Sequence, residues 1–187
     1  MLNGKRFMSQ ILGIFELGNQ VLRHYADPIN NVREERIQTL IDNLIITASQ
    51  ANGVGIAAPQ VGISDRLFII ASRPTLRYPN APLMEPTAMI NPKILNHSHK
   101  TIKDWEGCLS VPGIRGLVPR YQAIEIEYTN REGELCYQQL TDFVARIFQH
   151  ELDHLNGIVF VDRVESNQDL VTEAEYQKQI ADFHGFR

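Results

Sequence analysis

His150, Glu151 and His154 form an H-E-x-x-H sequence, which limits the folds that this chain can adopt. Apolar residues around it recur at helical spacing, which predicts a helix from residue 141 or 142 to residue 156, with Gly157 just beyond its end. Residues i and i+4 lie on one face of a helix, so both imidazoles can reach one metal ion. The helix must therefore be buried on one side and face a cavity on the other.

Glu151 stands beside the two histidines, where its carboxylate can reach a water molecule bound to such a metal. Hydrolysis needs this arrangement, because the metal lowers the pKa of the water towards 7 and the carboxylate transfers the proton. A hydrolytic site also needs a third protein ligand. Metzincin spacing is excluded because Phe160 occupies the required histidine position, whereas Cys108 and a downstream glutamate, Glu173 or Glu175, remain open.

The remaining pattern predicts an α+β fold, in which small antiparallel sheets pack around the central H-E-x-x-H helix. Periodicity predicts the other elements, which are a helix over 33–51, strands over 66–71 and 122–128, a hairpin partner over 135–140, a short strand over 158–161 and a weak helix over 170–180. Five prolines between residues 73 and 92 predict a long surface loop, and its part over 74–86 is expected to shape access to the site.

Neither a repeat nor a flexible linker divides the 187 residues, which predicts a single catalytic domain over 1–187. The polar stretch 165–187 is expected to form a C-terminal tail. Residues 1–8 are expected to be disordered or to precede the true start, which Met8 would then provide.

Charge and cysteine content exclude several classes of protein. The 18 Lys+Arg and 22 Asp+Glu residues give a net charge of −4, whereas binding to phosphate backbones needs clustered basic side chains. No apolar run approaches the roughly 18 residues that cross a bilayer. Two cysteines are too few for a disulfide scaffold and favour a reducing compartment. We therefore expect a cytoplasmic protein that binds neither nucleic acid nor membrane.

The two cysteines, Cys108 and Cys136, have different surroundings in the sequence. Cys136 lies in the middle of a predicted strand, and we expect it to be buried, as free cysteines usually are. Cys108 follows Gly107 and precedes a Pro/Gly turn, so it could be a buried apolar residue or a metal ligand. A nucleophilic role is less favoured, because the best candidate bases already have metal-ligand spacing.

The segment 53–60, Gly-Val-Gly-Ile-Ala-Ala-Pro-Gln, allows a ligand to approach its backbone closely. A dinucleotide-binding loop is excluded, because the third glycine is missing and the segment follows a helix instead of opening one. The segment could form a wall for an extended ligand with the Gln60 amide as a donor, or simply a tight turn.

Three ordered segments closely resemble the marks of the peptide deformylase family. They are G-x-G-x-A-A-P-Q at 53–60, E-G-C-L-S at 106–110 and Q-H-E-x-D-H-x-x-G at 149–157. The resemblance covers most of the chain up to about Val164. It implies an amide hydrolase that removes the formyl group from the N-terminal formyl-methionine of new polypeptides and releases formate.

The resemblance also implies a catalytic role for six positions. The metal ligands of the family fall on Cys108, His150 and His154, its general base on Glu151, and its oxyanion donors on the Gln60 side chain and the Leu109 N–H. The resemblance also implies one divalent ion, most often Fe²⁺, with Ni²⁺, Co²⁺ or Zn²⁺ as substitutes. A thiolate and imidazole set does not choose among these metals.

Further positions match the family around the substrate and behind the metal. Those around the substrate are Val54, Gly55, Phe143, Ile147 and His150. Glu106 and Arg115 resemble a pair that orders the metal-binding loop, and contacts of that kind orient ligands. Asp153 is left open between such a contact and a solvated helix position.

Two rival functions compete with a deformylase. A gluzincin-type peptidase would bind its metal through Glu173 instead of Cys108, and a catalytically silent member would bind peptides without turnover. Glu151 and Gln60 argue against the silent member, because a pure binder needs neither a proton shuttle nor an oxyanion donor. The ribosome is a further candidate partner, since similar tails contact it in some family members, although the mixed charge of 165–187 forms no basic patch.

Overall fold

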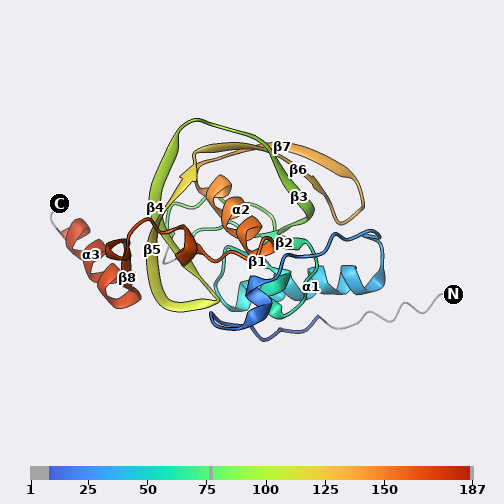
Figure 1. Cartoon of the computed structure of the whole chain (residues 1–187), viewed down its shortest axis with the longest axis horizontal. Coiled ribbons are helices and arrows are strands. Elements are labelled where there is room, and N and C mark those ends of the chain that lie inside the picture. The colour runs from blue at the N-terminus through green and yellow to red at the C-terminus, as the bar shows by residue number, and fades with distance from the viewer. Residues whose placement is uncertain (1–8, 76–77, 186–187) are drawn as a thin grey trace.

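Three α-helices and eight strands make up the part of the chain that the structure, a computed structural model, describes: residues 9–75 and 78–185 (Figure 1). The helices are α1 (Glu35–Gln50), α2 (Asp142–Leu155) and α3 (Glu173–Gly185). The strands are β1 (Gly55–Ala57), β2 (Leu67–Ile70), β3 (Thr87–His97), β4 (Thr101–Cys108), β5 (Val111–Tyr121), β6 (Ala123–Thr129), β7 (Leu135–Thr141) and β8 (Leu170–Thr172). Short 3₁₀ turns are η1 (Gln20–Arg23), η2 (Ala58–Val61), η3 (Phe160–Arg163) and η4 (Asn167–Asp169).

The strands form two antiparallel sheets, one of five strands in the order β1-β2-β3-β6-β7 and one of three in the order β4-β5-β8. Helix α2 contacts strands of both sheets and lies centrally between them (Figure 1). The predicted α+β fold with small antiparallel sheets around this helix is therefore confirmed. The arrangement brings the H-E-x-x-H residues of α2 next to the three-stranded sheet.

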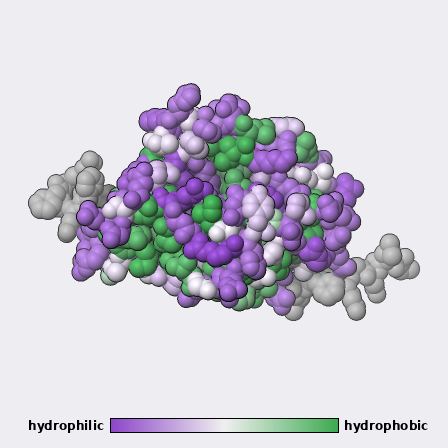
Figure 2. All heavy atoms as spheres, viewed as in Figure 1, coloured by the Kyte–Doolittle hydropathy of each residue, from purple (hydrophilic) through white to green (hydrophobic). Residues whose placement is uncertain are grey.

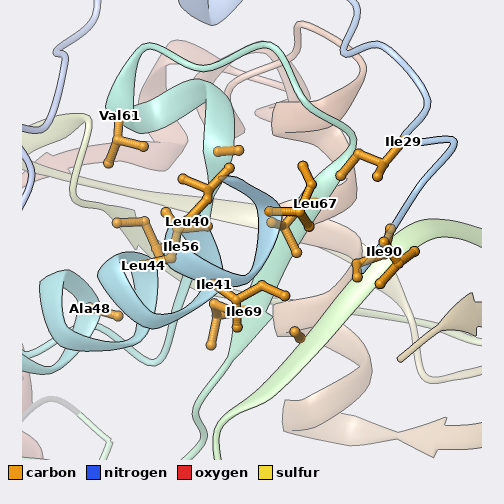
Figure 3. Close-up of a cluster of buried hydrophobic side chains, with 14 of the residues drawn as sticks. Ile29, Leu40, Ile41, Leu44, Ala48, Ile56, Val61, Leu67, Ile69 and Ile90 are labelled. Atoms are coloured by element: carbon orange, nitrogen blue, oxygen red, sulfur yellow. The ribbon is translucent and has the colours of Figure 1, made fainter. Parts of the chain in front are cut away.

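The apolar run over 66–71 forms β2, which is buried on both faces because each face packs against a helix. Leu67 and Ile69 join the cluster around α1, shown in Figure 3, whereas Phe68 and Ile70 join the cluster around α2. Successive strand residues point to opposite faces, so one uninterrupted apolar segment can serve both helices.

The predicted helix over 33–51 is confirmed as α1. Its apolar stripe, Ile37, Leu40, Ile41, Leu44 and Ala48, is buried against the five-stranded sheet, while Ile45 is only partly buried. Asn52 follows with a positive φ of 53°, which ends the helix where the sequence predicts.

The predicted hairpin is also confirmed, as β6 and β7 pair in register from Ala123 opposite Thr141 to Thr129 opposite Leu135. The apolar face of β6 packs towards α2, and its buried residues are Ile124, Ile126 and Tyr128. Cys136 of β7 is only half-buried, so the expectation of a buried thiol is wrong: β7 is the last strand of its sheet and is covered on one face only.

The predicted surface loop over 73–92 is too long. From residue 87 onwards the chain is β3, which lies in the middle of the five-stranded sheet with Met89 and Ile90 buried. Pro92 falls at a shift of register between Ile90 and Lys93, where the missing proline N–H is tolerated. Asn91 bends the chain there with φ 51°, and its side chain bonds the backbone N–H and C=O of Ile29.

The predicted strand over 158–161 is also wrong, because this segment turns into η3. The Asp162 carboxylate accepts the Val159 N–H at 2.8 Å and pairs with Arg23, so it closes a turn where the apolar pattern indicated extended chain.

The C-terminal tail has more order than the polar composition of 165–187 indicates. The weak helical pattern over 170–180 begins as strand β8 and becomes helical only at Glu173, the first residue of α3. Residues 1–8, which the sequence analysis expects to be disordered or to precede the true start, lie outside the described residues.

No helix among the described residues is long and apolar enough to cross a membrane. Hydrophilic and hydrophobic residues are interspersed over the face of the molecule that Figure 2 shows.

The packing of α2 on β2 leads to a stability prediction. Phe148 and Phe68 are fully buried and meet edge to face with their ring centroids 5.2 Å apart. Phe148→Ala should lower the free energy of unfolding by about 3–5 kcal/mol, because it removes a buried ring and leaves a cavity. Urea unfolding measures this, with Leu83→Ala as the control, since Leu83 is 80% exposed. Equal midpoints for the two variants would show that α2 does not depend on this contact.

Candidate metal centre

Two distant parts of the chain meet in a cluster of three potential metal ligands. His150 and His154 come from α2, and Cys108 is the last residue of β4, where a two-residue connection leads into β5. One donor atom from each of these residues lies within 4.8 Å of the other two, and the Cys108 Sγ is 3.2 Å from the His154 Nε2. The structure therefore brings together the three residues that the resemblance implies as ligands.

The chemistry of these donors fits a divalent metal ion. Glu106 Oε2 lies 2.8 Å from His150 Nδ1, so the proton of that imidazole sits on Nδ1 and Nε2 is left as the ligand atom. Burial lowers the pKa of His154 well below its usual value, which favours the neutral imidazole that binds metals. A thiolate with two imidazoles suits Fe²⁺, Co²⁺, Ni²⁺ or Zn²⁺ and not a hard ion such as Mg²⁺.

Glu106 is the centre of a buried charge network behind the cluster. Its carboxylate accepts hydrogen bonds from Arg120 Nε at 2.9 Å and Nη2 at 3.0 Å, and from Arg146 Nη1 at 2.8 Å. Burial alone would raise the pKa of Glu106, but Arg120 and the His150 imidazole hold it well below its usual range. Glu106 is therefore a fixed negative charge that orients His150.

Asp153 completes this network and is not a solvated helix position. It is buried, and its carboxylate accepts hydrogen bonds from Arg120 Nη1 at 2.6 Å and Arg163 Nη2 at 2.7 Å. Sequence reasoning missed Arg120 and Arg146 as partners of Glu106. An available signal was that both are cations close to buried apolar residues, Val118 in the case of Arg120, and Ala145 and Ile147 in the case of Arg146.

The expected pair of Glu106 and Arg115 does not form. Arg115 donates instead to the Glu173 carboxylate at 2.6 Å and to the Tyr78 hydroxyl at 2.9 Å. Arg115 and Arg120 are five positions apart in β5, so their side chains leave opposite faces of the strand, and Arg120 is the one that faces Glu106. Since Glu173 pairs with Arg115 and lies outside the three-residue cluster, the geometry does not favour it as a metal ligand.

Gln60 is held so that its amide nitrogen points towards the cluster. The backbone N–H of Ala57 donates to Gln60 Oε1 at 2.8 Å, while Gln60 Nε2 lies 3.4 Å from Cys108 Sγ and 3.1 Å from Ser110 Oγ. The side chain is only 2% exposed. The segment 53–60 is therefore more than a tight turn, because it fixes a donor beside Cys108.

The Glu151 side chain is buried near Cys108, His150 and His154. Its Oε2 atom is buried and has no hydrogen-bond partner among the described residues. Burial raises the pKa of Glu151 to about 7. Gly55 lies opposite it, and a Cβ at that position would lie 2.4 Å from Glu151 Oε1, so a larger residue there would displace the carboxylate.

A cavity opens beside the cluster. Its lining includes all five of the positions that match the family around the substrate, Val54, Gly55, Phe143, Ile147 and His150, together with Gln60, Leu109 and Glu151. Two aromatic residues in this lining were not predicted. Trp105 comes from β4, and Tyr78 comes from the Pro-rich loop. The position of Tyr78 in this lining fits the expectation that the stretch 74–86 shapes access to the site.

The known proteins that this chain resembles are peptide deformylases. The model of the family described as polypeptide deformylase matches residues 11–169. A curated relative from Nostoc sp., named peptide deformylase 2, is 64% identical over 171 residues, which are 91% of this chain and 96% of the relative.

Solved structures of peptide deformylases also resemble this chain. A class I type b peptide deformylase from Acinetobacter baumannii, bound to Met-Ala-Ser, is 45% identical with a TM-score of 0.82, and the match covers 84% of this chain and 100% of that one. A peptide deformylase from Synechococcus elongatus in complex with actinonin is 36% identical with a TM-score of 0.74, covering 90% of this chain and 87% of that one.

The cluster predicts which variants lose metal. Cys108→Ala should reduce bound divalent metal from about one ion per chain to a small fraction of that, because a two-histidine site lacks the third protein ligand. Elemental analysis of protein purified and dialysed in parallel measures this. Cys136→Ala, which removes a thiol far from the cluster in sequence, should keep its metal. Metal retained by Cys108→Ala but lost by Glu173→Gln would instead support the gluzincin arrangement.

Proposed function

The chain belongs to the polypeptide deformylase family, and from this premise we propose that it hydrolyses the N-formyl group of formyl-methionine at the start of newly made polypeptides. The products are formate and a free α-amine. The observation that carries this proposal is the unpartnered, buried carboxylate oxygen of Glu151 beside the cluster of Cys108, His150 and His154. We further propose that the enzyme works in the cytoplasm, where such polypeptides emerge.

Cys108, His150 and His154 would hold the metal ion. We propose Fe²⁺ as the native ion, with Ni²⁺, Co²⁺ or Zn²⁺ able to replace it. When bound, a divalent ion supplies a water of lowered pKa and polarises the carbonyl group under attack. Glu106 keeps the His150 ring in the orientation that this binding needs.

Glu151 would act as the proton carrier. Its side chain lines the cavity together with His150, so it can take a proton from the attacking water and return it to the leaving amine. Gly55 leaves room for the carboxylate in this place. A carboxylate whose oxygen has no protein partner within the described residues is free to exchange a proton with substrate and water.

The Gln60 amide and the Leu109 backbone N–H would stabilise the oxyanion that forms on the formyl carbon. Both residues line the cavity beside Cys108. The bond from the Ala57 N–H fixes the Gln60 amide before substrate arrives, which is the condition under which such donors are most effective.

The methionine side chain would occupy the apolar part of the cavity. Val54, Phe143 and Ile147 supply apolar walls there. Gly55 lies in β1, the first strand in the order of its sheet, so an extended peptide could pair with its backbone as an added strand. This geometry suits a chain terminus that enters the site lengthwise.

Formate release from formyl-Met-Ala-Ser by metal-loaded protein tests the proposal. The parent should release formate. Glu151→Gln should lower kcat by about 10²–10⁴-fold, because proton transfer is lost, and Gln60→Ala should lower it by roughly 10²–10³-fold, because an oxyanion donor is lost. Glu132→Gln, a change at an exposed turn, serves as the control and should match the parent.

Metal content is measured in every variant, so that loss of chemistry is separated from loss of metal. No formate from fully metallated parent would contradict the proposed activity, and continued binding of Met-Ala-Ser under those conditions would support a silent peptide binder. Full activity in Glu151→Gln would contradict its role as the proton carrier.

A further inference from the structure

The C-terminal segment of this chain lies beyond the residues that the family model matches, yet it packs behind the cavity. The family match ends at residue 169, whereas β8 and α3 begin at Leu170 and Glu173. Strand β8 pairs with β5 as the third strand of its sheet, and α3 contacts β5 as well, so the segment completes this sheet at one end of the molecule (Figure 1).

Glu173 supplies the counter-charge for a buried cation. The Arg115 side chain is 1% exposed, and within the described part of the chain its one ion pair is with Glu173, at 2.6 Å. The Tyr176 ring, one turn further along α3, lies 5.2 Å from the same guanidinium. A buried charge that loses its partner is strongly destabilised, so the position of Arg115 depends on α3.

Arg115 in turn contacts the site from behind in two places. Its Nη1 donates to the Tyr78 hydroxyl at 2.9 Å. Its guanidinium also lies against the backbone of Gly107, the residue before Cys108, so closely that a Cβ at Gly107 would be 2.6 Å from Nη1. Arg115 therefore links the C-terminal helix to the loop residue Tyr78 and to the strand end that carries Cys108.

The two aromatic residues that sequence reasoning missed are both backed by this segment. The Tyr78 ring packs on Phe143 with centroids 4.8 Å apart, and both rings line the cavity. Trp105, which also lines it, packs on Tyr176 of α3 at 5.4 Å. The aromatic wall on this side of the cavity is thus supported from behind by two residues of α3.

We propose that Glu173 is a positioning residue for substrate binding: through Arg115 it holds Tyr78 against Phe143 and so sets the affinity of the cavity for the formyl-methionyl peptide. This inference rests on the proposed function. It assigns a functional part to a segment beyond the family match. The chemistry of the reaction is left to Glu151 and Gln60, so the effect falls on KM and not on kcat.

Steady-state kinetics on formyl-Met-Ala-Ser test this inference, together with the dissociation constant of the product peptide Met-Ala-Ser. Glu173→Gln should raise both KM and that dissociation constant about tenfold, the scale of a lost charged hydrogen bond, with kcat within about threefold of the parent. Tyr78→Phe removes only the hydroxyl that Arg115 contacts and should raise KM in the same direction. Because both act through Arg115, the double variant should be no worse than Glu173→Gln.

Glu175→Gln is the matched control, because Glu175 lies on the same helix, is exposed, and pairs with Lys178. It should leave KM and kcat unchanged. Unchanged KM in Glu173→Gln, or a loss of kcat alone, would overturn the inference. If Glu173→Gln fails to fold, the KM of Tyr78→Phe decides: a raised KM supports the inference, and an unchanged KM overturns it. A parent that releases no formate would refute the proposed activity, while the Met-Ala-Ser dissociation constants would still decide the role of Glu173.

Discussion

The buried carboxylate of Glu106 links the parts of the molecule that form the site. It lies on β4, two residues before Cys108, and accepts hydrogen bonds from Arg120 of β5 and from Arg146 and His150 of α2. One charged group therefore orients an imidazole and ties the strand that carries the thiol to the helix that carries both histidines. Arg120 and Arg146 bring two positive charges to one Glu106 carboxylate, and Asp153 supplies a second negative charge through its ion pair with Arg120. Removal of one member of such a network leaves a buried charge without a partner, which typically costs about 3–5 kcal/mol.

The sequence was informative wherever a local pattern determines the structure. The stripe of α1 and the alternation of β6 each mark one buried face, and the i, i+4 spacing of His150 and His154 places them together on α2. Strands β3 to β5 were missed because their prolines and glycines resemble loop signals, whereas pairing makes them extended: β3 pairs with β2 and β6, and β5 with β4 and β8. The partners of Glu106 were missed for a related reason: Arg120 and Arg146 are 14 and 40 positions away, and only the tertiary fold decides which arginine reaches the carboxylate.

Glu106 was predicted to pair with Arg115 but pairs with Arg120, and the two arginines have different partners in the structure. Arg120 and Arg115 leave opposite faces of β5, so one strand supports the site from two directions. Arg120 joins the charge network around the histidines. Arg115 joins Tyr78 on the rim of the cavity to Glu173 of the C-terminal helix. The charge network around Glu106 thus orients the histidines, whereas Tyr78 on the cavity wall depends on the contact between Arg115 and Glu173.

X-ray absorption spectroscopy of the metal-loaded protein tests whether Cys108, His150 and His154 bind the ion, because it reports the neighbouring atoms without reference to activity. We expect one sulfur at about 2.3 Å and two imidazole nitrogens at about 2.0–2.1 Å, if Zn²⁺ is used as the probe ion. The small fraction of metal that Cys108→Ala retains should show no sulfur neighbour. A spectrum with only nitrogen and oxygen neighbours in the parent protein would contradict the assignment of Cys108, and with it the structural role given to Glu106.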